Sequence, residues 1–335
     1  MQLILVIPGL PELRAGMTTS VRASALAHLL ALAGAPTREA GGTAAALAAR
    51  YGVTRQADWP LAPIRLAALG VDPGAAFWLA ADPVTLAVGR SDVRLAGLVD
   101  DLDRAAADAL VATLNAHFAG DGLAFVAPRP DAFFVRSATS ARLSTHPPHA
   151  ALGRPLHRLL PEGADADTWR RWQAEIEMLL HEHPVNAERE RAGQAPANSV
   201  WFSCGGTMPR PPAPAVSIRT FAAAGIAAAL AAHAGSPARA LPGHLGTARE
   251  DAPGASAIVV ALEPAIDIAA LERAWAAPAR DALARGAFDA VTLLAEDRGD
   301  AVVWRARRPG FWQRFAGRRQ RRDLAALLDD ASRDF

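Results

Sequence analysis

Lysine is absent from the 335 residues, and all 35 basic side chains are arginines. This absence excludes chemistry that needs a lysine amine, as in the usual phosphate-loop NTPases, pyridoxal Schiff bases and lysine-nucleophile aldolases. Cys204 is the only cysteine, so an intramolecular disulfide and zinc sites with several thiolates are excluded as well. We therefore expect a reducing compartment, the cytoplasm.

Long apolar runs are also lacking. The first run, residues 3–7, stops at Pro8-Gly9 and is shorter than a signal-peptide core of ~7–15 residues. The alanine-rich stretch 221–232 falls short of the ~20 residues that a membrane span requires. The charges nearly balance, since 35 basic and 34 acidic residues leave a net charge of +1. We expect no membrane partner, and nucleic acid is not the expected partner because long-range attraction to polyanions is weak.

Several continuous apolar runs have the length and composition of strands that are buried on both faces. They cover residues 3–7, 200–202, 258–262 and 291–294, with helical patterns at 221–233 and 268–285. Strands that alternate with helices favour an α/β fold with a mostly parallel sheet and helices on both faces.

The middle third of the chain has a different pattern. Amphipathic helices are predicted over 104–119 and 165–182, and two short strands, 123–126 and 132–135, lie between them. A single core stops growing near ~250 residues, so a chain of this length favours two units. We predict an α/β core domain made of residues 1–95 and 196–335, with a small α+β lobe, residues 96–195, inserted into it.

A dense run of polar and bend-forming residues follows the second of these helices. It comprises His183-Pro184-Val185-Asn186, Arg189, Gly193 and residues 196–201. The helix must end at His183, because a proline disfavours helical geometry in the residue before it. Asn186 and Asn198 can hydrogen-bond backbone groups along the connection that follows, and Gly193 and Pro196 fix its bends.

Read together with Pro147-Pro148-His149, Gly153 and Leu160-Pro161, this spacing resembles the archaeal-type cofactor-independent phosphoglycerate mutases of the alkaline phosphatase-like superfamily. The resemblance is strongest over about residues 104–210. It implies an alkaline phosphatase-like core with an inserted substrate-facing lobe, and phosphoryl transfer that uses two divalent metals and a hydroxyl nucleophile. Weaker landmarks, at 80–84, 177–180 and around Trp304, resemble a divergent proteobacterial branch labelled either phosphoglycerate mutase or a pathogenicity-factor (Rpf-type) regulatory protein.

The resemblance gives four residues two alternative roles. His149, Asn186, Arg189 and Asn198 form an anion site if they face the cleft between the lobes, where the arginine would match phosphate or carboxylate oxygens with its planar fork. The alternative, which we favour, is that they only brace the hinge between the lobes.

The chain departs from the family pattern where the catalytic centre would lie. The family's Asp-Gly pair after the first strand is Pro8-Gly9 here, and the later ligand clusters become residues 262–267 and Glu296-Asp297-Arg298, without histidines. An arginine at a ligand position places a fixed positive charge beside a dication and opposes metal binding. Thr18, Thr19 and Ser20 remain as candidates for the hydroxyl nucleophile, but the helix after them lacks a carboxylate.

We therefore predict a catalytically degenerate, phosphoglycerate mutase-like protein without a resident cofactor. It would bind a small phosphorylated or carboxylated metabolite, or a protein partner, in a regulatory role. A second hypothesis is an active mutase or phosphatase whose Mn or Mg ligands are rearranged among Glu263, Asp267 and Asp297. A third assigns partner binding to the arginine-rich segment after Trp304, where Phe311, Trp312 and Phe315 are interleaved; its alternative is that these aromatics pack on the sheet.

Overall fold

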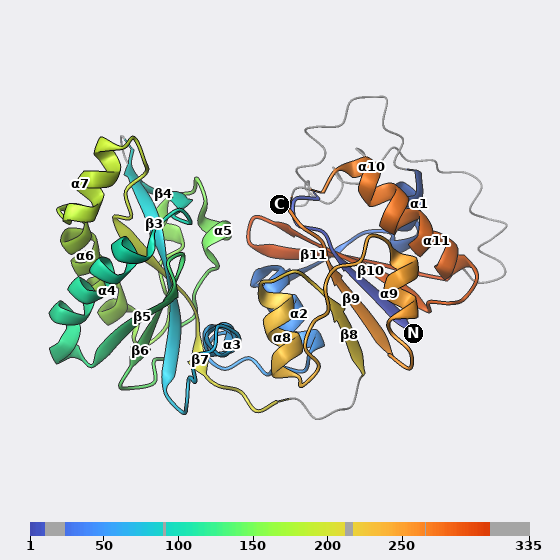
Figure 1. Cartoon of the computed structure of the whole chain (residues 1–335), viewed down its shortest axis with the longest axis horizontal. Coiled ribbons are helices and arrows are strands. Elements are labelled where there is room, and N and C mark those ends of the chain that lie inside the picture. The colour runs from blue at the N-terminus through green and yellow to red at the C-terminus, as the bar shows by residue number, and fades with distance from the viewer. Residues whose placement is uncertain (11–23, 90–91, 212–216, 265, 309–335) are drawn as a thin grey trace. The chain divides into compact units, whose positions relative to one another are not determined.

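The computed structural model describes all residues except 11–23, 90–91, 212–216, 265 and 309–335 (Figure 1). The chain divides into two compact units. The first, here called the sheet unit, consists of Met1–Gly52 and Pro211–Phe335, and the second, the inserted unit, consists of Val53–Arg210. In the described part of the chain, no helix combines the length and the apolarity needed to cross a membrane.

The sheet unit is built on a six-stranded sheet in the order β2-β11-β10-β1-β9-β8. Its strands are β1 (Gln2–Val6), β2 (Thr37–Ala40), β8 (Ile218–Phe221), β9 (Ala257–Ala261), β10 (Ala290–Asp297) and β11 (Asp300–Arg307). Strands β8, β9, β1 and β10 are parallel, whereas β11 runs antiparallel to both β10 and β2. The apolar run at the start of the chain becomes an inner strand, as its composition predicts.

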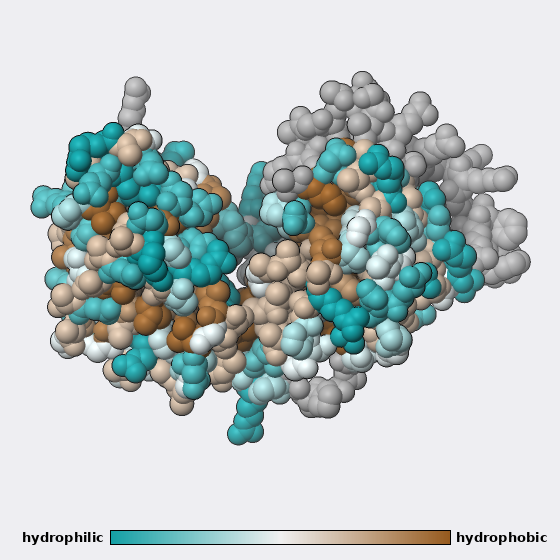
Figure 2. Space-filling model, viewed as in Figure 1, coloured by the Kyte–Doolittle hydropathy of each residue, from teal (hydrophilic) through white to brown (hydrophobic). Residues whose placement is uncertain are grey.

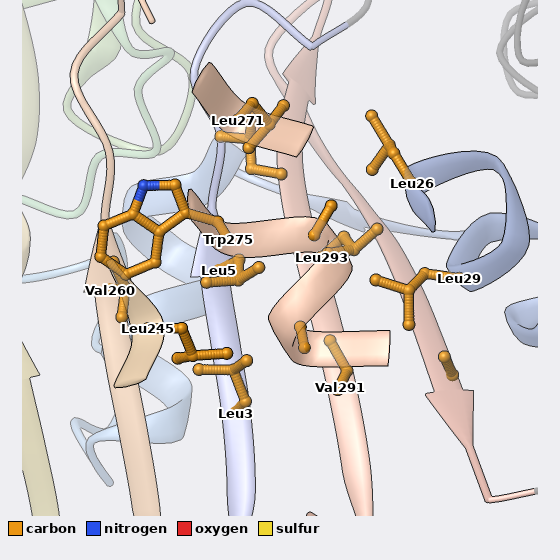
Figure 3. Packing of buried hydrophobic residues seen from close by; sticks show 14 of the residues in the cluster. Leu3, Leu5, Leu26, Leu29, Leu245, Val260, Leu271, Trp275, Val291 and Leu293 are labelled. Carbon is orange, nitrogen blue, oxygen red and sulfur yellow. The ribbon is translucent and has the colours of Figure 1, made fainter. Parts of the chain in front are cut away.

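Helices cover both faces of this sheet (Figure 1). They are α1 (Ser24–Ala33), α2 (Gly42–Arg50), α8 (Ile226–His233), α9 (Leu245–Glu250), α10 (Ile268–Leu271), the π-helical turn η4 (Glu272–Ala276) and α11 (Ala277–Ala284). Successive strand residues point to opposite faces. Leu3 and Leu5 therefore pack with Trp275 beneath the layer that contains α1, α9 and α11 (Figure 3). Helices α2 and α8 lie on the other side. The predicted α/β class, with a mostly parallel sheet, is confirmed.

The inserted unit has a separate, antiparallel sheet. Its strands are β3 (Phe77–Val88), β4 (Val93–Leu98), β5 (Leu123–Arg129), β6 (Ala132–Ser137) and β7 (Ser199–Thr207). The order is β4-β3-β6-β5, and β7 pairs with the long central strand β3. The strands at 123–126 and 132–135 were predicted from sequence and are confirmed as β5 and β6.

Helices also cover the sheet of the inserted unit. They are α3 (Leu61–Ala68), α4 (Arg104–Phe118), α5 (Pro148–Ala151), α6 (Ala166–His181) and α7 (Pro184–Arg191), with the 3-10 turns η2 (Ala119–Asp121) and η3 (Leu156–Arg158). Phe77 and Leu79 of β3 pack in the core with α4 and α6, whereas Trp78 and Ala80 pack with α3. The alternation along β3 thus buries both of its faces. Helices α4 and α6, predicted over 104–119 and 165–182, are confirmed within one residue at each end.

The predicted boundaries of the two domains, 1–95 and 196–335 around 96–195, differ from those of the structure. Strands β3 and β7 pair with each other inside the inserted unit, with Asp82 opposite Trp201, so the breaks fall after Gly52 and Arg210. The assignment of residues 200–202 to the parallel sheet is wrong, because an apolar run looks the same whichever sheet receives it. The helix predicted over 221–233 begins only at Ile226, since Phe221 still belongs to β8.

Side-chain amides complete the backbone pairing at two strand edges of the inserted unit. Asn115 accepts a hydrogen bond from the Phe125 N–H at 2.7 Å and donates one to the Phe125 carbonyl at 2.9 Å, on the edge strand β5. Gln56 does the same with Thr207 at the end of β7, at 3.0 and 2.9 Å. A carboxamide presents one acceptor and two donors, so it can replace a neighbouring strand at a single residue and leave that stretch of edge less open to pairing with other chains.

The packing of β7 predicts a specific effect at Gly206. A Cβ atom there would lie 2.6 Å from the Cβ of Pro60 and 2.9 Å from Oε1 of Gln56. We expect Gly206→Ala to lower the free energy of unfolding by about 1–3 kcal/mol, the usual cost of overpacking. The measurement is urea denaturation followed by tryptophan fluorescence.

The matched control is Gly97→Ala in β4, where an added Cβ would meet no atom within 4 Å. That variant should keep wild-type stability or gain slightly, because alanine restricts the unfolded chain. Equal stability of the two variants would contradict the packing argument.

Candidate functional site

The carboxyl end of the parallel sheet is the place where an α/β fold of this kind offers a site. β1 lies between β9 and β10, which follow each other in the chain, so the strand order switches there. Ligands of open α/β sheets bind beyond the carboxyl ends of the strands at such a point. Val6 is level with Ala261 and Leu294, which places Pro8-Gly9, the acids after β9 and the acids at the end of β10 along this edge.

Glu296, near the end of β10, is used by the first turn of α2. Its Oε2 accepts hydrogen bonds from the Thr43 N–H at 3.2 Å and from the Thr43 hydroxyl at 2.9 Å. The carboxylate lies so close to Gly42 that a Cβ there would be 3.0 Å from Oε2. A carboxylate is stabilised at a helix N-terminus by the unpaired N–H groups and the helix dipole.

Two other acids of this region play the same part. Glu272 accepts hydrogen bonds from the N–H groups of Ala25 and Leu26, at 2.5 and 3.0 Å, in the first turn of α1. Asp267 accepts hydrogen bonds from the N–H groups of Ala269 and Ala270 in α10, both at 3.1 Å. A helix N-terminus is where backbone N–H groups would otherwise hold a phosphate. In α1, α2 and α10 the protein's own carboxylates bind there.

Asp297 and Arg298 belong to the hairpin that joins β10 to β11. The Asp297 carboxylate is paired with Arg38 at 2.9 Å, and Arg38 also donates to the Asp297 carbonyl at 3.0 Å. Asp297 is opposite Asp300, so Arg298-Gly299 forms a two-residue turn. Both turn residues have positive φ, 53° and 91°, as a type I′ turn requires. This segment therefore serves strand pairing.

The three predicted metal ligands, Glu263, Asp267 and Asp297, each have a different environment. Asp267 caps a helix, Asp297 pairs with an arginine, and Glu263 is exposed after β9. Within the described residues, no three His, Cys, Asp or Glu side chains lie close enough together to hold a metal ion. The nucleophile candidates Thr18, Thr19 and Ser20 lie outside those residues, as do Phe311, Trp312 and Phe315 of the arginine-rich segment.

Asn186 and Asn198, predicted as ligand-binding or bracing residues, bond to the backbone of the inserted unit. The amide of Asn186 is buried; it donates to the carbonyls of Leu180 and Ala197, at 2.7 and 3.0 Å, and accepts from the Ala197 N–H at 2.8 Å. Asn198 pairs in the same way with both backbone groups of Leu86, at 2.7 and 2.9 Å. The interpretation that these two amides bond the backbone is confirmed, although the connection stays inside the inserted unit.

Arg189 and His149 were the charged members of the predicted anion site. Arg189 is 6% exposed; its Nε donates to the Ala195 carbonyl at 2.8 Å, and its Nη2 lies 2.5 Å from the Asp101 carboxylate. The structure therefore brings Asn186, Arg189 and Asn198 together along the segment from α7 to β7. His149 lies on a different element, the exposed side of α5.

A buried polar cluster that the sequence did not indicate lies around Asp58. Its carboxylate accepts hydrogen bonds from the Thr145 hydroxyl and N–H, and from the N–H groups of Trp59 and Gly205. Burial raises the pKa of Asp58, and these hydrogen bonds oppose the shift. The Thr145 hydroxyl in turn accepts from the Cys204 N–H at 2.9 Å. No motif marks these residues, since the contacts join segments 87 residues apart.

The cluster pairs the N–H groups of Cys204 and Gly205 in β7. It does not activate Cys204 as a nucleophile. Burial raises the pKa of the Cys204 thiol to about 12, so the thiolate, the reactive form, is scarce at neutral pH. Gly205 and Gly206, which a phosphate-binding loop would expose, instead pack closely against Phe77, Leu79 and Pro60. Their lack of a side chain serves packing.

No model of a known protein family matches the chain. Its homologues among curated proteins are 2,3-bisphosphoglycerate-independent phosphoglycerate mutases. That of Methanosarcina barkeri is 28% identical over 159 residues, which cover 44% of this chain and 37% of the relative. That of Methanothrix thermoacetophila is 39% identical over 66 residues, which cover 20% and 17%. The matches thus span well under half the length of these relatives.

Two solved structures are similar to the chain at low sequence identity. The cofactor-independent phosphoglycerate mutase from Thermoplasma acidophilum superposes with a TM-score of 0.41 at 14% identity, covering 99% of this chain and 98% of its own. The PH0037 protein from Pyrococcus horikoshii gives a TM-score of 0.47, also at 14% identity, and covers 91% and 87%.

The bonds of Asn186 predict its contribution to stability. Asn186→Ala leaves two carbonyls and one N–H without this partner, and a buried polar group without a partner costs about 1–3 kcal/mol. We expect a loss of about 2–4 kcal/mol in the free energy of unfolding, measured by denaturant titration. Glu190→Gln, at an exposed position on the same helix, is the control and should change little. Wild-type stability of Asn186→Ala would remove the bracing role.

Proposed function

We propose that the chain is a divergent phosphoglycerate mutase-like protein whose two-metal centre is lost and which acts by binding. Its similarity to phosphoglycerate mutases supports the origin of the scaffold. The observation that carries the loss of catalysis is the use of the acids along the carboxyl end of the parallel sheet. Glu296, Glu272 and Asp267 cap helices, and Asp297 pairs with Arg38.

Metal-dependent phosphoryl transfer explains why these contacts matter. Two divalent ions must be held a few ångströms apart by several carboxylates or histidines that point to one place, because the ions stabilise both the attacking and the leaving oxygen. A carboxylate that turned from a helix cap toward a metal would leave N–H groups of that helix unpaired. In Asp297 the ion pair with Arg38 competes with a metal in addition. The residues present therefore fit a Mn or Mg pair poorly.

The binding role extends the resemblance to the divergent proteobacterial, Rpf-type regulatory branch. Under this proposal the protein works in the cytoplasm, without a resident cofactor, and binds a small phosphorylated or carboxylated metabolite or a protein partner. In this proposal Asn186, Arg189 and Asn198 brace the segment from α7 to β7 and do not bind the ligand. Their contacts support that role, since their polar groups face the protein's own backbone and Asp101.

The first experiment measures metal content and mutase activity together. Protein purified without chelator and then supplied with Mn or Mg should hold far less than one metal per chain and should not convert 3-phosphoglycerate above the blank, because the donors do not converge. The mutase of Methanosarcina barkeri, prepared in the same way, is the positive control.

Stoichiometric metal together with turnover would overturn the proposal in favour of an active mutase with rearranged ligands. Glu263→Gln would then be the first variant to test, because Glu263 is exposed directly after β9. Loss of both metal and turnover in that variant would identify a replacement ligand.

A further inference from the structure

Helices α4, α6 and α7 of the inserted unit border an open groove of about 570 Å³. Its lining includes Thr113, His117, Glu175, Glu182 and His183. The surface over α6 and α7 is largely hydrophilic (Figure 2). His183 is distinct among these residues, because it is buried and stands at the joint between α6 and α7.

Both ring nitrogens of His183 are engaged. Nδ1 accepts a hydrogen bond from the Val185 N–H at 3.2 Å and so caps the N-terminus of α7. Nε2 lies 3.0 Å from the hydroxyl of Thr113 on α4. A neutral imidazole carries one proton, so an Nδ1 that accepts requires the proton to be on Nε2, which donates to Thr113. His183 thereby links α7 to α4 through a single tautomer.

We propose that His183 is a pH-sensitive latch, and that its protonation releases the start of α7 from α4 and changes the wall of the groove. An imidazolium has a proton on both nitrogens, so Nδ1 can no longer accept the Val185 N–H. Two N–H groups then face each other, and the positive charge also lies at the positive end of the α7 dipole.

The charged groups around the ring compensate this charge poorly. His117 of α4 is paired at 3.1 Å with Glu175 of α6. The carboxylate of Glu175 also lies 3.5 Å from Arg171, on the same helix α6. Glu182, the last residue before His183, is exposed. On α7 itself, Arg189 is occupied by Asp101. Burial of the ring lowers the pKa of His183.

The lowered pKa of His183 determines how the stability of the latch depends on pH. Because the folded-state pKa lies below the unfolded value of about 6.5, the latch contributes fully to stability above that pH. Its contribution is lost as the pH falls through the unfolded value toward the folded one. Helix α7 also carries Asn186 and Arg189, which hold the residues before β7, so loosening at His183 reaches the edge of the sheet.

The test is hydrogen exchange of the full chain at about pH 7.5 and about pH 5, with each amide corrected for its intrinsic rate. In the wild type, the protection of Val185 and Ala187 should fall about tenfold at the lower pH, while that of Leu110 in α4 stays constant. In His183→Asn the side-chain oxygen can cap the helix without titrating, so α7 should be equally protected at both values.

Two results would overturn the latch. One is equal protection of α7 in the wild type at both pH values, and the other is the same loss of protection in His183→Asn. Should the variant fail to fold, the ring nitrogen shifts of His183 in the wild type decide the matter at neutral pH. An unprotonated Nδ1 supports the latch, whereas a protonated Nδ1 refutes it. None of these outcomes depends on whether the protein holds metal or turns over 3-phosphoglycerate.

Discussion

The need to pair buried backbone N–H and carbonyl groups explains the roles of several polar side chains in the described part of this protein. In the inserted unit, the amides of Gln56, Asn115, Asn186 and Asn198 each bond both backbone groups of one residue. They act where a strand edge or a connection lacks a neighbouring strand. At helix N-termini the same need is met by carboxylates and by the ring of His183. The fold thus depends on side chains that substitute for secondary structure.

This requirement also bears on catalysis. A carboxylate can direct its lone pairs to helix N–H groups or to a metal ion, and shared use weakens both. Glu296 lies near the end of β10 and Asp267 follows β9, in the segments where the resemblance to phosphoglycerate mutases would place metal ligands. Both carboxylates instead bond to helix N-termini. The turn Arg298-Gly299 adds a hairpin at the same edge. The contacts that stabilise these helix termini are therefore the same ones that support the proposed loss of metal chemistry.

The predictions from sequence succeeded where periodicity is local. Helices α4 and α6, strands β5 and β6 and the break at His183-Pro184 follow from apolar spacing and from the restrictions of proline. The backbone hydrogen bonds of Asn186 also follow from the local sequence, although they lie within the inserted unit and not at a hinge between two lobes. The boundaries of the units were misplaced, since the strand at 199–207 could belong to either sheet, and only its pairing with β3 decides.

The sequence by itself determined the α/β class and the types of most elements. It also excluded lysine-dependent chemistry and an intramolecular disulfide, because it has no lysine and a single cysteine. The tertiary structure decided which strands pair and what each polar side chain does. Asp58 meets Thr145 and Gly205, Glu272 meets the start of α1, and His183 meets Thr113. The physical reason is range: helical and strand patterns arise from neighbours in the chain, whereas a hydrogen bond between distant segments exists only once both are packed.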